Sequence, residues 1–131
     1  MSGPGILLSV AAICMGASIG AVLRWLLGLQ LNHLLPTLPL GTLAANLLGG
    51  YAIGLVLGWL GQHPELPPQV RLFLVTGLLG GLTTFSTFSA EVVTHLVGGR
   101  TAWAIVVAVT HLTGSLALTA LGLATAARIA R

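Results

Sequence analysis

The sequence predicts an all-α integral membrane protein with four transmembrane helices, and three observations support this fold class. Of the 131 residues, 56% are hydrophobic and 5% are charged, whereas soluble domains average about 45–50% and about 25%. Four apolar stretches each reach the length of about 20 residues that a helix needs to cross the hydrocarbon core of a bilayer. Turn-forming residues separate these stretches. Five arginines and two glutamates cannot cover a soluble surface, so lipid must surround most of the chain.

The predicted spans form a single four-helix domain, 1–131, a length that suits one domain. In chain order they cover residues 6–29, 38–60, 72–97 and 102–127. They are separated by Pro36 and Pro39, by the proline-rich segment 62–68 and by the turn 98–100. Four spans put both termini on the same side of the membrane. The first stretch is too long for a signal-peptide core and follows no basic segment, so we expect a membrane helix there.

Charge and motif content argue against several function classes. There is no lysine and the five arginines are scattered singly, whereas a nucleic-acid-binding face needs clustered basic residues. We therefore expect no nucleic-acid partner. The four histidines lie on different segments, which gives no metal-ligand spacing. With no nucleophile–base pair and no lysine-containing phosphate loop, the sequence predicts no enzyme.

The arginines give almost no orientation signal. The side that holds the termini has Arg71, Arg128 and Arg131, and the opposite side has Arg24 and Arg100. Orientation follows the bias of basic residues in short loops, so insertion in either direction is nearly equally favoured. A chain that inserts both ways can form an antiparallel homodimer whose two-fold axis lies in the membrane plane. A fixed topology set by weaker signals fits the charges equally well.

Glycines mark two faces for close helix packing. Gly50, Gly54 and Gly58 repeat every four residues on the second span, and Gly16 and Gly20 do the same on the first. Small residues at this spacing let helix backbones approach closely in lipid. We expect both faces to contact neighbouring helices.

The third span contains an unusual cluster of glycine and hydroxyl residues over 77–89, centred near Thr84. Gly80 and Gly81 each cost roughly 1 kcal/mol in a helix relative to alanine. The serines and threonines that follow are poor in helix interiors and good at helix starts. This pattern predicts a helix end, a short unwound segment and a new helix start near the bilayer midplane. A continuous helix whose hydroxyls bond back to carbonyls fits the composition equally well.

A broken helix in hydrocarbon would free backbone groups that must find partners. Freed carbonyls suit a hard monovalent cation, and the freed N–H groups of the next helix suit an anion. Discontinuous helices serve transporters in this way. Phe85 and Phe88 share one face of the second half-helix. Two such rings usually pack, but their positive edges also allow weak contact with a small anion.

Polar side chains interrupt the second and fourth spans. Asn46 lies in mid-span, where a buried amide is costly unless it is bonded, so it either joins helices or lines a polar path. His111, Ser115 and Thr119 follow at intervals of four and form one polar stripe on the fourth span. The stripe suggests a hydrated track. For His111 alone, a proton relay and a structural histidine both fit.

Two charged residues lie near span ends. Arg24 is expected to snorkel its charge to the interface, and an anion attractor at a pore mouth is the alternative. Glu91 is the only acid within an apolar stretch. It suits a cap, a pair with an arginine, an aqueous vestibule or a coupling carboxylate.

Together these residues resemble the bacterial Fluc (CrcB) fluoride channels over nearly the whole chain. The resemblance lies in Gly16 to Trp25, Gly41 to Leu43, Asn46 to Gly49, Thr76-Gly77, Gly80 to Ser89 and Gly114-Ser115. It implies passive, fluoride-selective export across the bacterial cytoplasmic membrane. It also implies a dual-topology antiparallel dimer with two pores and a central sodium ion. Backbone carbonyls of Gly80 and Thr83 from both subunits would hold this ion.

The resemblance also implies a fluoride pathway. Its residues on this chain would be Asn46, Phe85, Phe88, Ser115, Thr119, His111 and Thr87. His111 departs from the hydroxyl residue usual on this track, and Val107 stands where an aromatic hydroxyl is common. Fluoride is small and strongly hydrated, so amide, hydroxyl and ring-edge donors must replace its water. A narrow dehydrating path would exclude chloride by size.

Two other functions fit parts of the sequence. A small proton-coupled multidrug transporter shares the four-helix, dual-topology design but needs a carboxylate deep within a span. The first two spans have none, and Glu91 lies near an end. A structural subunit would explain the glycine faces but not a helix break flanked by pore-type donors.

Overall fold

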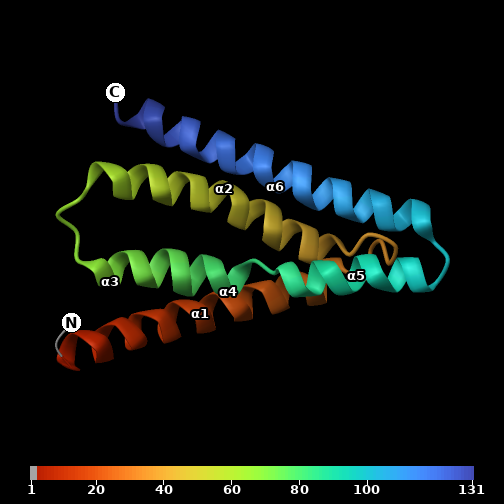
Figure 1. The fold of residues 1–131 in the computed structure, drawn as a ribbon, viewed down its shortest axis with the longest axis horizontal. Coiled ribbons are helices and arrows are strands. Elements are labelled where there is room, and N and C mark those ends of the chain that lie inside the picture. The colour runs from red at the N-terminus through yellow and green to blue at the C-terminus, as the bar shows by residue number, and fades with distance from the viewer. Residues whose placement is uncertain (1–2) are drawn as a thin grey trace.

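The computed structural model describes residues 3–131, and this part of the chain contains helices and connecting turns but no strand. The helices are α1 (Gly3–Leu31), α2 (Leu40–Gln62), α3 (Pro68–Arg71), η1 (Leu72–Leu79), α4 (Gly80–Leu82), α5 (Phe85–Val97) and α6 (Thr101–Ile129). The long elements run side by side, and the start of α1 and the end of α6 lie at the same end of the bundle (Figure 1).

Four helical stretches are long and apolar enough to cross a membrane, which confirms the all-α fold with four spans. They run over Gly5–Leu31, Leu40–Gln62, Pro68–Val97 and Thr101–Ile129. Most of these helices extend a few residues beyond the predicted ranges, because counting apolar residues marks the hydrocarbon part of a longer helix. The third begins at Pro68, where proline suits the first turn because its missing N–H would have no helical partner there.

The third stretch changes its neighbour halfway along. Its first part, η1 and α4, packs on α1, whereas α5 packs on α6. Between them Thr83 (φ −84°, ψ 156°) and Thr84 (φ −149°, ψ 120°) have extended backbones. The coil between α4 and α5 is visible in Figure 1. The most extensive helix contact in the bundle is the one between α2 and α6.

Glycines allow the closest of these contacts, as their spacing predicted. Gly16 and Gly20 of α1 face the backbones of η1 and α4. Gly54 of α2 faces Gly122 of α6, where each glycine lies against the backbone of the other helix. The π-helical geometry of η1, with its wider i→i+5 turn, was not predicted.

Asn32 supplies a cap for α2 that the sequence did not reveal. The residue before α2 is Pro39, which makes no side-chain cap bond. Instead the Asn32 Oδ1 atom accepts from the N–H groups of Gly41 at 2.8 Å and Thr42 at 3.2 Å. The end of α1 is therefore joined to the start of α2.

We predict that Gly54→Ala destabilises the protein. The new Cβ would overlap the carbonyl oxygen of Thr119 on α6, and such overpacking costs about 1–3 kcal/mol. The midpoint of thermal unfolding in detergent should fall. Gly61→Ala is the matched control, because nothing lies within 4 Å of a Cβ there. Equal midpoints for the two variants would contradict the role assigned to the α2–α6 contact.

Candidate functional site

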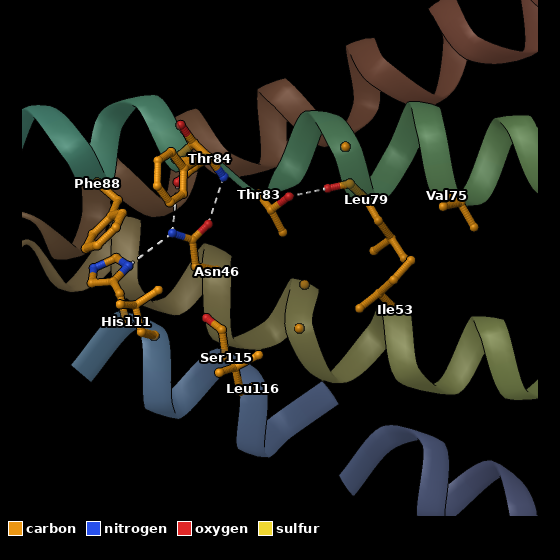
Figure 2. A pocket seen from close by; sticks show the side chains of 15 residues that line it. Asn46, Ile53, Val75, Leu79, Thr83, Thr84, Phe88, His111, Ser115 and Leu116 are labelled. Atoms are coloured by element: carbon orange, nitrogen blue, oxygen red, sulfur yellow. Dashed lines mark hydrogen bonds between the residues drawn. The ribbon is translucent and has the colours of Figure 1, made fainter. Parts of the chain in front are cut away.

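The side chain of Asn46 pairs with the backbone of Thr84 in the extended segment. The Thr84 N–H donates to Asn46 Oδ1 at 2.7 Å, and Asn46 Nδ2 donates to the Thr84 carbonyl at 3.0 Å. Because a backbone N–H can only donate, the first bond fixes which end of the amide carries oxygen. Figure 2 shows Asn46 reaching from α2 to this segment. Asn46 thus joins helices and also lines a cavity, so both predicted roles are compatible with its position.

This pairing redirects the hydrogen bonds that would continue the helix. In an α-helix the Gly80 carbonyl accepts from Thr84 N–H and the Thr83 carbonyl accepts from Thr87 N–H. Here Thr84 N–H donates to Asn46, and Thr87 N–H donates to the Thr84 hydroxyl at 3.1 Å, which caps α5. The carbonyls of Gly80 and Thr83 have therefore lost their helical donors.

Arg24 bonds to another backbone group next to the non-helical segment between α4 and α5. Its Nε atom donates to the carbonyl of Gly81 at 3.1 Å, the carbonyl that Phe85 N–H would meet in a continuous helix. Arg24 also lines a cavity of about 350 Å³. Its side chain therefore bonds to the protein backbone across the α1–α4 contact, a role that the snorkelling prediction did not include.

His111 connects Asn46 to the aromatic residues. Its Nδ1 atom lies 3.0 Å from Asn46 Nδ2. Its ring stacks on Phe88 with centroids 4.8 Å apart, and Phe85 meets Phe88 edge to face at 5.4 Å. Phe88 and His111 are buried, whereas Phe85 is 73% exposed. The structure thus brings together four of the predicted pathway residues.

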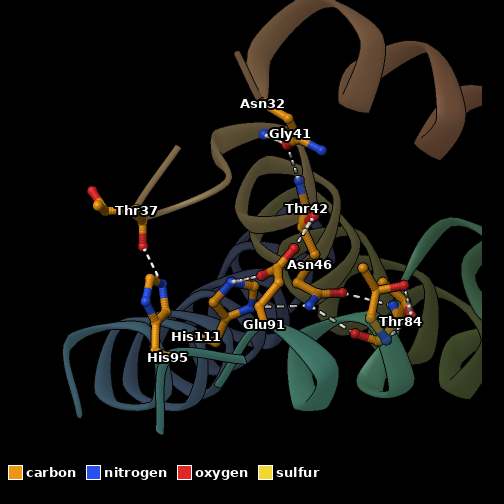
Figure 3. Close-up of polar contacts among 10 residues, drawn as sticks. Asn32, Thr37, Gly41, Thr42, Asn46, Thr84, Glu91, His95 and His111 are labelled. Carbon is orange, nitrogen blue, oxygen red and sulfur yellow. Dashed lines mark hydrogen bonds and ion pairs between the residues drawn. The ribbon is translucent and has the colours of Figure 1, made fainter. Parts of the chain in front are cut away.

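Glu91 lies on the other side of the His111 ring. The Thr42 hydroxyl donates to Glu91 Oε1 at 2.6 Å, and Glu91 Oε2 lies 4.0 Å from His111 Nε2 (Figure 3). Within residues 3–131 these last two atoms are buried and have no hydrogen-bond partner. Glu91 faces a threonine and a histidine, so of the roles that the sequence left open for it, the pair with an arginine is not found among residues 3–131.

Two cavities meet at Thr84. The larger is open, about 400 Å³, and is lined by Asn46, Gly49, Gly50, Ile53, Val75, Leu79, Gly80, Thr83, Thr84, Phe85, Phe88, His111, Leu112, Ser115 and Leu116. The smaller is lined by Arg24, Trp25, Gly28, Leu29, Asn32, Thr42, Thr84 and Thr87. Thr84 therefore separates an amide- and aromatic-lined space from one that holds a guanidinium group.

The predicted polar stripe on α6 reaches the larger cavity only in part. His111 and Ser115 line it, but Thr119 does not. The Thr119 hydroxyl lies 2.9 Å from the Ser115 carbonyl and 3.0 Å from the Gly50 carbonyl, so it bonds to backbone between α2 and α6. Equal spacing along a helix does not reveal which hydroxyls a neighbouring backbone occupies.

Sequence reasoning missed two buried contacts. The first is the bond from the Thr42 hydroxyl to Glu91. Thr42 lies four residues before Asn46, on the same face of α2, and this spacing was a signal that could have linked it to the site. His95 is 4% exposed. Its Nε2 bonds to the Thr37 carbonyl at 2.8 Å, and Arg100 Nε donates to its Nδ1 at 3.0 Å. This second contact depends on tertiary structure and has no local signal.

The fold and this site define a multi-pass membrane protein with a polar cluster at a non-helical point of its third span. The model of the CrcB-like protein family, also described as Camphor Resistance (CrcB), matches residues 11–123. Relatives named fluoride-specific ion channel FluC are 62% identical in Burkholderia vietnamiensis and 58% identical in Pseudomonas paraeruginosa. These matches cover 90% and 88% of this chain and 92% and 91% of the relatives. The chain belongs to the CrcB family, which confirms the resemblance.

We predict that Thr84→Val destabilises α5. The change keeps the side-chain shape but removes the oxygen that accepts from Thr87 N–H, and loss of such a cap costs about 0.5–2 kcal/mol. Thermal unfolding in detergent should show a lower midpoint. In Thr113→Val, the control, the lost hydroxyl only bonds back to Val109 on an exposed face of α6. A Thr84 variant as stable as this control would contradict the capping role.

Proposed function

We propose that this chain is a fluoride-selective channel that lets fluoride leave the bacterial cytoplasm passively and so relieves fluoride toxicity. The names of its relatives support fluoride as the permeant ion. The structural observation that carries the proposal is the group formed by Asn46, Thr84 and Phe88 beside an open cavity at the interrupted span. Amide and hydroxyl groups of the kind that can donate to a small anion lie there beside two aromatic rings.

The residue types suit fluoride in particular. Removing the hydration shell of a small anion requires replacement donors, which amide and hydroxyl groups of Asn46 and Ser115 supply. The edges of Phe85 and Phe88 carry positive partial charge and add weak contacts. Arg24 in the adjoining cavity favours anions over cations by its charge. Fluoride would therefore pass from a basic space into one whose amide, hydroxyl and ring-edge groups replace its water.

The functional unit in this proposal is an antiparallel, dual-topology homodimer in the cytoplasmic membrane. Phe85 is 73% exposed at an open cavity that contains polar side chains. Lipid cannot satisfy polar groups, so a second copy of the chain is the cover that best fits this face. The near balance of arginines between the two sides permits both orientations.

A sodium ion at the dimer centre fits the freed backbone oxygens. The carbonyls of Gly80 and Thr83 have lost their helical donors to Asn46 and to the Thr84 hydroxyl. Neutral carbonyl oxygens suit a hard cation, and a two-fold axis would combine the pairs from two protomers. The bound ion would supply positive charge that holds the two interruptions together.

We predict that purified protein in liposomes releases fluoride and retains chloride. A fluoride-selective electrode measures efflux after a potassium ionophore removes the charge imbalance, with chloride-loaded liposomes as the control. Efflux of both ions at similar rates, or of neither, would contradict the proposal.

We also predict that Asn46→Asp and Phe85→Ile each impair fluoride efflux by about tenfold or more while the dimer persists. An aspartate in place of Asn46 would replace donors by acceptors, and the removal of one donor built for a substrate commonly costs this much. Cross-linking in membranes checks the dimer. The matched control is Phe73→Ile, because Phe73 lies on η1 outside both cavities. Efflux at the wild-type rate in both test variants would remove these residues from the pathway.

A further inference from the structure

The donors of Asn46 are fully used in this structure. One N–H of its amide bonds to the Thr84 carbonyl and the other to His111 Nδ1, while its oxygen accepts from Thr84 N–H. An anion can take a donor from Asn46 only if one of these partners leaves. The Thr84 contacts hold the backbone of the interruption, so the bond to His111 is the one that can open without unfolding the segment.

The same bonds fix the state of the His111 ring. Asn46 Nδ2 can only donate, so His111 Nδ1 must accept and the ring is neutral, with its proton on Nε2. That Nε2–H points toward Glu91 Oε2 across 4.0 Å. The His111 side chain is 2% exposed and that of Glu91 is 13% exposed. The imidazole therefore lies between an amide donor and a carboxylate, as Figure 3 shows.

We propose that His111 is a positioning residue of the fluoride pathway that holds the second N–H of Asn46 until the ring takes up a proton. Protonation at Nδ1 turns the acceptor into a donor, and two donors cannot bond to each other. The Asn46 N–H is then free for fluoride, and the imidazolium moves toward Glu91. Fluoride conduction therefore rises as the pH falls. This inference rests on the proposed function.

Among residues 3–131, Glu91 is the charged group that faces His111 and can respond when the ring takes up a proton. The helices that pack on α6 are α2 and α5. From α5, Glu91 faces the ring, while His95 is held by Thr37 and Arg100. From α2 come the uncharged Asn46 and Thr42. The titratable residue of α2, Tyr51, bonds to Thr125 near the far end of α6.

Fluoride efflux from proteoliposomes tests the proposal when it is measured between about pH 8 and about pH 5.5, the range in which histidine titrates. Leakage from protein-free liposomes is subtracted at each pH, because hydrogen fluoride crosses bilayers. We expect wild-type efflux to rise by about twofold to tenfold, the factor that one net hydrogen bond represents. In His111→Asn the acceptor for Asn46 remains but cannot be protonated, so efflux should stay low and independent of pH.

Two further variants make the test specific. His111→Ser removes the ring, so its efflux should be high and independent of pH, which keeps the test usable if the asparagine variant does not fold. His63→Asn is the matched control for histidine loss, since His63 follows α2 at the end of the bundle and bonds to the Trp59 carbonyl. It should retain the wild-type pH profile.

Several outcomes would overturn the inference. Wild-type efflux that does not change with pH would do so, as would a rise that persists in His111→Asn. A rise that disappears in Glu91→Gln but persists in His111→Asn would assign the titration to the carboxylate instead. Fluoride efflux without pH dependence removes only this inference, whereas no fluoride efflux from any folded variant removes the proposed function with it.

Discussion

A backbone that leaves the helical conformation inside an apolar span must find partners for its amide groups, and in this chain the side chain of Asn46 supplies them. Lipid offers no hydrogen bonds, and each unsatisfied buried group costs several kcal/mol. Asn46 bonds to both the N–H and the carbonyl of Thr84. This contact lets α4 end at Leu82 and α5 begin at Phe85. The third span can then leave α1 and pack on α6.

The groups that satisfy the interruption also form the candidate site. Asn46 connects Thr84 to His111, and the ring of His111 connects Phe88 to Glu91. Arg24 donates a hydrogen bond to the Gly81 carbonyl, which has also lost its helical donor, and it lines the neighbouring cavity. Because one set of side chains holds the backbone and lines the cavities, substitutions there should change packing and conduction together. For this reason each functional variant needs a fold control and a matched substitution outside the cavities.

The sequence was most informative where one physical constraint acts alone. Apolar length located the four spans, and the spacing of Gly16, Gly20 and Gly54 marked helix contacts that the structure shows. It was less informative where an outcome depends on a neighbour. Gly80 and Gly81 suggested a helix end, yet the helix continues to Leu82. It ends there because the N–H of Thr84 donates to Asn46 instead of to a helical carbonyl. The Thr42–Glu91 bond and the bond from the Thr119 hydroxyl to the Gly50 carbonyl arise only when α2 meets α5 and α6.

Hydrogen exchange at the backbone amide of Thr84 tests the central role of Asn46 most directly. We expect this amide to exchange slowly in lipid nanodiscs, because its N–H is bonded to the Asn46 oxygen inside the bundle. In Asn46→Leu, which keeps the volume but removes the acceptor, exchange at Thr84 should accelerate by about tenfold or more, while amides in the middle of α6 stay protected. A Thr84 amide that exchanges equally slowly in both proteins would show that another group holds the interruption, and would contradict the role assigned to Asn46.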